Sequence, residues 1–123
     1  MQFIRSRRTG ATLIVTVVAG ASVAAGVASA ASTLKIDSAK GKLAFTKSRA
    51  TAKAGKVTLV MKNPNSFKHA IAVKGKGINK KGKVVGKGGT SRVSVSLKKG
   101  TYEFYCPVPG HEKGGMKGTL VVR

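Results

Sequence analysis

The chain has 123 residues, of which 24 are lysine or arginine and 3 are aspartate or glutamate, giving a formal net charge of +21. About 100 to 200 residues make one domain, and 41% of the residues are hydrophobic, which argues against the disordered class of low hydrophobicity and high charge. The positive charge favours acidic proteins or anionic polymers as partners and disfavours basic ones.

The first 30 residues have the pattern of an export signal. A start with three arginines precedes an almost wholly apolar or small stretch at residues 11–27, and an A-x-A cleavage motif ends at Ala30. We expect residues 1–30 to be a signal peptide and residues 31–123 to be one domain, exported to the periplasm or the extracellular side. Two questions stay open, namely retention of the apolar stretch as a membrane anchor and export through the twin-arginine route.

The rest of the chain has the pattern of an all-β domain. Short segments of alternating or β-branched residues are separated by turns that contain glycine, proline or asparagine. They predict strands at residues 34–36, 43–45, 56–62, 69–73, 92–97, 101–105 and 118–122. Residues 75–89, crowded with glycine and lysine, predict an exposed loop with little order of its own. No helix pattern of useful length is present, and short strands at this spacing indicate a Greek-key β-sandwich or barrel.

Cys106 is the only cysteine, so it cannot form an internal disulfide, and an odd cysteine in an exported protein needs another explanation. Cys106, His111 and Met116 follow one another at five-residue steps between two predicted strands. These are ligand types of a blue-copper site, in which two histidines and a cysteine bind in a plane with a long axial methionine. The other histidine, His69, is predicted at a strand start, where it can point off the sheet end. The alternatives for Cys106 are an inert buried thiol and an intermolecular disulfide. The alternatives for His69 are solvent exposure and a local hydrogen bond.

Met61 lies within an apolar predicted strand and is interpreted as core filler. Met116, between Gly115 and Lys117, has no such packing role in the sequence pattern, so it is the candidate axial ligand.

Further residues around the candidate ligands match one known pattern. They are Asn63 with Phe67-Lys68-His69, the run from Gly100 to Cys106, Pro109-Gly110-His111, Gly115-Met116, and Gly118 before an apolar final strand. With them the chain resembles the cupredoxin family, in the plastocyanin and azurin group, over roughly residue 43 to the C-terminus. The resemblance implies a cupredoxin-like fold and one type 1 copper ion. It implies strong ligation by His69, Cys106 and His111 and axial ligation by Met116.

Two departures from the family pattern concern the surroundings of the ligands and the reduction potential. The spacing from Cys106 to His111 is longer than in plastocyanins. Ala70 stands where many relatives have an asparagine that ties the two ligand loops together.

Four protein ligands leave no position for substrate or water on the metal, which favours electron transfer over catalysis. We therefore expect a non-enzymatic, monomeric carrier of single electrons that uses Cu(I)/Cu(II). Its expected partners are acidic redox proteins, such as a cytochrome, an oxidase or a reductase. His111, flanked by Lys113 and Lys117, is the expected exit for the electron.

Two other functions remain open. The first is copper storage or delivery, which requires an exchangeable site. The second is a cationic exported domain that binds polyanions, including a loose association with an anionic cell envelope. Specific nucleic-acid binding is not expected, because no aromatic residue interleaves with the lysine-rich segment as a stacking platform. A cysteine nucleophile is disfavoured because no carboxylate or asparagine is placed to orient a base.

Overall fold

The computed structural model describes residues 30–123, so all of the predicted signal peptide except Ala30 lies outside the described residues. The described part of the chain is all-β, as predicted. Its strands are β1 (Ala30–Lys35), β2 (Arg49–Ala52), β3 (Gly55–Lys62), β4 (Ala72–Gly75), β5 (Ile78–Lys81), β6 (Thr90–Leu97), β7 (Gly100–Tyr105) and β8 (Lys117–Val122). Within residues 30–123 there is no helix of the length and apolar character needed to span a membrane.

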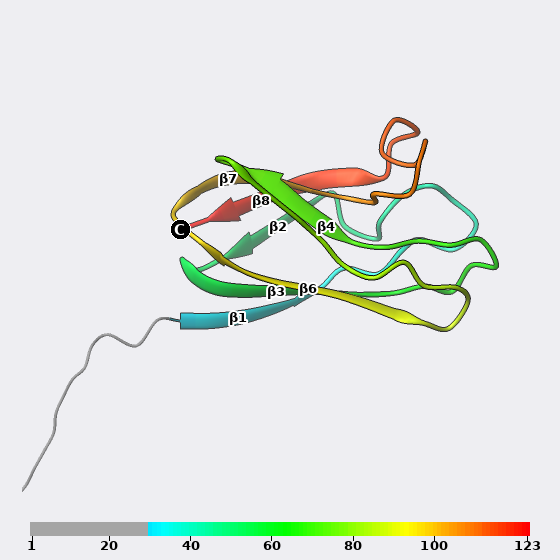
Figure 1. Cartoon of the computed structure of the whole chain (residues 1–123), viewed down its shortest axis with the longest axis horizontal. Helices are drawn as coiled ribbons and strands as arrows, with labels where there is room; N and C mark the ends of the chain where they lie inside the picture. Colours follow the sequence, from blue (N-terminus) through cyan, green and yellow to red (C-terminus); the bar gives the residue numbers. More distant parts are fainter. Residues whose placement is uncertain (1–29) are drawn as a thin grey trace, which may run out of the picture.

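The strands form two sheets that face each other as two layers (Figure 1). One sheet has the order β1-β3-β6 and the other has the order β2-β8-β7-β4-β5. The pairs β1–β3 and β2–β8 are parallel, and the other neighbours are antiparallel. The chain crosses repeatedly between the sheets, and the predicted Greek-key β-sandwich is confirmed.

The core lies between the two sheets and follows from alternation along the strands. In β3, Val57, Leu59 and Met61 are fully buried, while the residues between them face outward. Successive side chains of a strand point to opposite faces of its sheet, so an apolar residue at every second position is enough to build the core. The opposite layer contributes Phe104, whose ring meets the edge of Phe45 at a centroid distance of 5.3 Å. Burial of each such side chain stabilises the fold by about 1.5–3 kcal/mol.

Two differences from the predicted strands lie before β3. The strand predicted at residues 43–45 is wrong, because Phe45 makes only an isolated bridge with Ser38. The sequence pattern did not predict β2, which consists of small and polar residues and pairs in parallel with β8. Pairing along an available sheet edge outweighs the weak intrinsic strand preference of such residues.

The segment from His69 to residue 89 also differs from its prediction. Strand β4 begins at Ala72 and not at His69, because His69 and Val85 form an isolated bridge instead. The segment predicted as a loop contains β5, which pairs with β4. Lys76 and Gly77, between the two strands, both have positive φ, 49° and 79°. This is the geometry of a two-residue hairpin turn, but a lysine at the first position hides the usual asparagine-glycine signal.

Candidate metal centre

His69 lies in the connection between β3 and β4, and several hydrogen bonds fix this connection. The carboxamide Nδ2 of Asn63 donates to the carbonyls of Phe67 and Val85, both at 3.0 Å. The backbone N–H of Asn63 donates to the carbonyl of Gly89 at 3.0 Å, and that of His69 donates to Val85 at 3.1 Å. Asn63 and His69 are both fully buried. The position of His69 is thus fixed by a buried asparagine and by backbone bonds.

The other predicted ligands lie on one loop that starts where β7 ends. The backbone N–H of Cys106 donates to the carbonyl of Met116 at 3.1 Å, and that of Met116 donates to His111 at 3.0 Å. Gly110 and Gly115 have φ values of 84° and 110°, which are far less strained for glycine than for other residues. The loop therefore closes on itself, and it lies at the end of the sandwich opposite the C-terminus (Figure 1).

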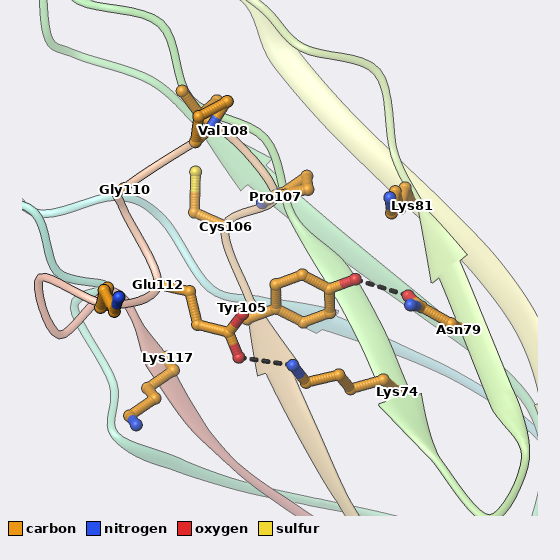
Figure 2. A pocket seen from close by; sticks show the side chains of 12 residues that line it. Lys74, Asn79, Lys81, Tyr105, Cys106, Pro107, Val108, Gly110, Glu112 and Lys117 are labelled. Atoms are coloured by element: carbon orange, nitrogen blue, oxygen red, sulfur yellow. Dashed lines mark hydrogen bonds and ion pairs between the residues drawn. The ribbon is translucent and has the colours of Figure 1, made fainter.

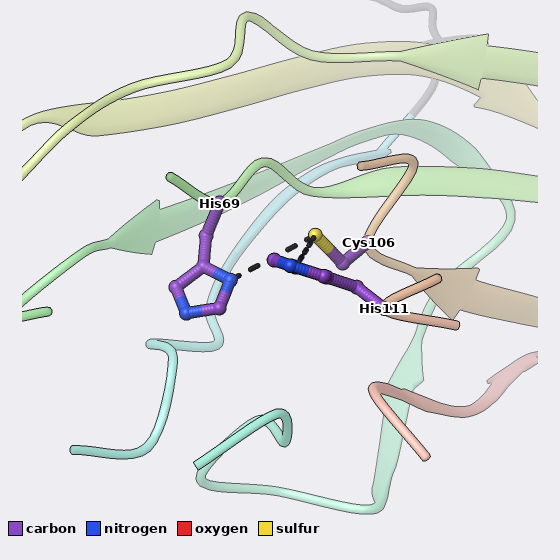
Figure 3. A group of neighbouring side chains, drawn as sticks. All are labelled: His69, Cys106 and His111. Carbon is purple, nitrogen blue, oxygen red and sulfur yellow. Dashed lines mark hydrogen bonds between the residues drawn. The ribbon is translucent and has the colours of Figure 1, made fainter. Parts of the chain in front are cut away.

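The structure brings His69, Cys106 and His111 together, although they come from two segments of the chain (Figure 3). The Sγ atom of Cys106 lies 3.9 Å from Nδ1 of His69 and 3.4 Å from Nδ1 of His111. A sulfur and a nitrogen that bind one ion at about 2.0–2.3 Å in a trigonal plane stand about 3.7 Å apart. The two observed distances lie on either side of that value, and all three donor atoms fall within 4.8 Å of one another. This donor set fits a copper ion.

Burial tunes the protonation of these groups before any metal binds. Burial lowers the pKa of His69, and the nearby His111 lowers it further, so the His69 imidazole is neutral at neutral pH. Burial raises the pKa of the Cys106 thiol, an effect opposed by hydrogen bonds from the backbone N–H groups of Ala70 and Val108. The thiol is therefore protonated without metal, and its proton must leave when a metal binds. The two backbone donors are then placed to stabilise the thiolate.

Met116 is fully buried and belongs to the core cluster that also contains Cys106. The interpretation that Met116 has no packing role is therefore wrong, because its place in a glycine-flanked loop does not reveal that its side chain turns inward. Met61 lies in the core as expected. Both backbone bonds of Met116 go to other candidate ligands, Cys106 and His111.

The structure adds two residues to the site that sequence reasoning did not assign. Asn65, only 4% exposed, places its Nδ2 atom 3.2 Å from Nε2 of His69. Phe67, 40% exposed, packs edge-on against His69 and His111, at centroid distances of 4.9 and 6.5 Å. Asn65 had no sequence signal besides its closeness to His69, and Phe67 stood in the family pattern without an assigned role.

A polar cluster lies beside the site on the outer face of the five-stranded sheet (Figure 2). Lys74 Nζ lies 2.6 Å from Glu112, 3.6 Å from Glu103 and 4.4 Å from the centre of the Tyr105 ring. The Tyr105 hydroxyl donates to Oδ1 of Asn79. A hydrogen bond between the two carboxyl groups raises the pKa of Glu103 and lowers that of Glu112. Lys74 is thus committed to carboxylates within the protein.

This cluster borders a hollow of about 620 Å³ that reaches Cys106 and Pro107. Three other lysines line it, Lys81, Lys113 and Lys117. Within residues 30–123 none of the three has a carboxylate at ion-pair distance. The hollow therefore has a net positive charge, from four lysines against Glu112, next to the candidate cysteine ligand.

A β-sandwich that gathers a thiol and two imidazoles at one end defines a cupredoxin, a small blue copper protein. The family described as copper binding proteins, plastocyanin/azurin family, matches residues 32–123. The chain belongs to this family, and copper is its cofactor.

Solved structures support the same fold. Reduced auracyanin from Roseiflexus castenholzii is 27% identical with a TM-score of 0.65, over 74% of this chain and 96% of that one. Auracyanin A, a "blue" copper protein from Chloroflexus aurantiacus, is 28% identical with a TM-score of 0.66, over 76% of this chain and 100% of that one. Auracyanin B shares the fold. It is 22% identical with a TM-score of 0.67, over 80% of this chain and 93% of that one. Among curated proteins, no sequence matches this chain.

Proposed function

We propose that this protein is an exported type 1 copper protein that carries single electrons between redox partners. His69, Cys106 and His111 are the proposed strong ligands, and Met116 is the proposed axial ligand. The observation that carries the proposal is the convergence of one thiol and two imidazole nitrogens, with 3.4 and 3.9 Å between sulfur and nitrogen. Bound copper supplies a one-electron couple, Cu(I)/Cu(II).

The chain's own residues suit this role by holding the donor atoms still. Backbone bonds fix His69 to Val85, and further bonds join Cys106 to Met116 and Met116 to His111. A site that moves little when its charge changes exchanges electrons with little reorganisation. Because His69 and Cys106 are fully buried, water is kept away from two of the donors.

His111 is the proposed exit for the electron because it is the partly exposed member of the donor set. Two exposed apolar side chains lie near it. Phe67 packs against the His111 ring, and Leu43 packs on the ligand loop so closely that a Cβ at Gly114 would come within 2.9 Å of it. These side chains offer a small apolar contact that excludes water during transfer and still lets a partner leave quickly.

We propose acidic redox proteins as partners, with a carboxylate-bearing segment seated in the hollow that Lys81, Lys113 and Lys117 line. The three lysines have no carboxylate partner in the described chain. A partner's carboxylates would complete the charge pairing and steer the approach. The expected carrier is a monomer.

An enzymatic role is not proposed, because four protein ligands leave no position for a substrate at the metal. Copper delivery would need easy release of the ion, and the full burial of Cys106 and His69 opposes it. The lysine excess also suits loose retention on an anionic cell envelope, and this role is compatible with electron transfer.

We also propose that residues 1–30 are a signal peptide and that residues 31–123 form the exported copper domain. Cleavage after Ala30 would keep the pairing of residues 31–35 with β3. Mass spectrometry of the exported protein checks the cleavage site, and a mass that includes the first 30 residues would contradict it.

The test of the electron-transfer proposal is an absorption spectrum of the copper-loaded protein together with a potentiometric titration. An intense visible thiolate-to-copper band and a reversible one-electron couple are expected. Cys106→Ser is the matched control, which should lose the band and the couple while circular dichroism shows a folded sandwich. Absence of the band in the parent protein would contradict the proposal. Loss of the fold together with the colour in Cys106→Ser would mean a structural metal.

A further inference from the structure

Asn65 contacts the edge of the His69 ring that points away from the other candidate metal ligands. Its Nδ2 atom lies 3.2 Å from Nε2 of His69, while Nδ1 of the same ring faces Sγ of Cys106 (Figure 3). Both Asn65 and His69 are buried, so a mismatched pair of polar atoms here would be costly. The orientation of the Asn65 amide therefore decides which His69 tautomer is favoured.

Backbone groups fix that orientation. Oδ1 of Asn65 accepts a hydrogen bond from the N–H of Gly41 at 2.6 Å. Its Nδ2 atom donates one hydrogen to the carbonyl of Ala39 at 3.0 Å, and its other hydrogen is shared between the hydroxyl of Ser38 at 3.3 Å and Nε2 of His69 at 3.2 Å. A flipped amide would set its NH₂ against the Gly41 N–H and its oxygen against the Ala39 carbonyl, two repulsive contacts in a buried place. Asn65 therefore presents an NH₂ group to His69.

A neutral imidazole carries one N–H and one lone pair. Facing an NH₂ group, Nε2 is satisfied only as an acceptor, which puts the ring proton on Nδ1. Nδ1 then points at the sulfur of Cys106, 3.9 Å away, a weak acceptor. The two contacts agree, so the metal-free site favours the Nδ1–H form of His69.

Metal ligation requires the opposite form. A metal on Nδ1 binds the lone pair of that nitrogen, so Nδ1 must lose its proton. Nε2 then carries the single proton of the neutral ring, and the charge of the ring does not change. That N–H then faces the Asn65 NH₂ group, donor against donor. Metal-binding histidines usually donate their other N–H to an acceptor, which raises ligand basicity. The contact at Asn65 is the reverse of this arrangement.

We propose that Asn65 is a positioning residue that disfavours the ligating tautomer of His69 and so weakens this histidine as a donor. A weaker imidazole donor destabilises Cu(II) more than Cu(I), because the more highly charged ion gains more from a basic ligand. The expected result is a lower Cu(II) affinity and a higher reduction potential than an acceptor at position 65 would give. This inference rests on the proposed ligation by His69.

The first test needs no metal. In the ¹⁵N-labelled metal-free protein at neutral pH, long-range ¹H–¹⁵N spectra report which ring nitrogen of each histidine is protonated. We expect the proton of His69 on Nδ1, and in Asn65→Asp we expect it on Nε2, because a carboxylate can accept from both Gly41 and Nε2–H. The tautomer of His111, whose Nδ1 lies 3.4 Å from the same sulfur, is assigned in the same spectra. A His69 proton on Nε2 in the parent would overturn the inference.

The second test measures the metal-bound protein. Asn65→Asp should bind Cu(II), and Zn(II) as a redox-inert probe, about 10-fold or more tightly, with a lower reduction potential. Ser38→Ala is the companion variant, because it removes the acceptor that competes with Nε2 for an Asn65 hydrogen and leaves the Asn65 bonds to Gly41 and Ala39; it should not lower the potential. Circular dichroism checks the fold of both variants.

The two proposals fail in different ways. If the parent shows the blue band but Asn65→Asp leaves potential and affinity unchanged, the inference is wrong and the proposed function stands. If the parent shows no blue band, the proposed function is wrong, and a metal-free His69 proton on Nδ1 still supports the tautomer argument.

Discussion

The donor atom of Met116, the proposed axial ligand, can be changed with little disturbance of its loop. Its sulfur belongs to a buried side chain and its backbone is bonded to Cys106 and His111, so a substitution changes the donor atom more than the loop. Glutamine has a similar length and offers an amide oxygen. An oxygen donor stabilises the oxidised ion more than a thioether does.

We therefore expect Met116→Gln to keep copper and to lower the reduction potential by at least about 59 mV, which is a tenfold change in relative affinity for a one-electron couple. Spectroelectrochemistry measures this shift. Met61→Leu is the control, because Met61 is also fully buried but is interpreted as core; it should leave the potential unchanged. A parent-like spectrum and potential in Met116→Gln would remove Met116 from the ligand set.

The buried His69 also predicts how the metal-free domain responds to pH. Burial lowers the pKa of His69 in the folded state from its ordinary value of 6.5. Below pH 6.5 the unfolded chain binds a proton that the folded chain does not, so acid favours unfolding. The free energy of unfolding should be unaffected by this group above pH 6.5 and should fall as the pH drops from 6.5 toward the lowered folded pKa.

Urea unfolding of the metal-free protein at several pH values between 7.5 and 5 measures this slope. His69→Gln removes the titrating group and should flatten the dependence within this window. Both proteins contain the Glu103 and Glu112 pair, so the difference between them reports on His69 and its interaction with His111. An equal slope in the two proteins would contradict the burial argument.

At the scale of the elements, the parts that the sequence predicts well are local. Cys106, His111 and Met116 lie within one loop between two alternating strands, so their spacing alone indicates a common site. Strands β3, β6, β7 and β8 carry the alternation that burial of one face requires. Their approximate bounds could therefore be predicted without knowledge of the partner strands.

The parts that the sequence did not predict depend on contacts between distant segments. His69 forms an isolated bridge with Val85, and for this reason β4 does not extend back to His69. The contacts of Asn65 reach back to Ala39 and Gly41, 26 and 24 residues away. Strand β2 forms because the edge of β8 is free to pair. None of these pairings leaves a periodic signal in a single sequence.

Packing between elements yields a prediction at Gly118, in strand β8. A Cβ built at Gly118 would lie 2.2 Å from Cζ of Phe104 and 2.8 Å from the carbonyl oxygen of Ser48. Because Phe104 is a fully buried core residue, it cannot move away easily. Gly118→Ala should lower the free energy of unfolding by about 1–3 kcal/mol, in the range of overpacked cores.

Chemical denaturation of the metal-free protein measures this loss. Gly86→Ala is the matched control, because a Cβ at Gly86 meets nothing within 4 Å. That substitution should be neutral or should stabilise by up to about 1 kcal/mol, through the reduced freedom of the unfolded chain. Equal effects of the two substitutions would show that the β8–Phe104 contact is not tight.

At the scale of the whole molecule, the lysines also act on the edges of the sheets. The edge strand β5 carries Lys80 and Lys81, both exposed. Charged residues on an edge strand oppose pairing with a second copy. A high net charge of one sign adds repulsion between copies, which supports the proposed monomer and leaves docking to partners of opposite charge.

Charge steering gives the last prediction, which concerns the rate of electron transfer. The screening length falls from about 30 Å at 0.01 M to about 8 Å at 0.15 M ionic strength, so the association rate with an acidic exported cytochrome should fall steeply across this range. Lys81→Glu should slow the low-salt reaction and flatten its salt dependence, because Lys81 lines the hollow. Lys56→Glu makes the same charge change on β3, in the other sheet, and should slow the low-salt reaction less.

Stopped-flow mixing measures the rates of both variants. Equal effects of the two variants would move the docking site away from the hollow. A salt-independent rate, or faster transfer to a basic cytochrome, would show that the lysines serve retention on an anionic envelope instead.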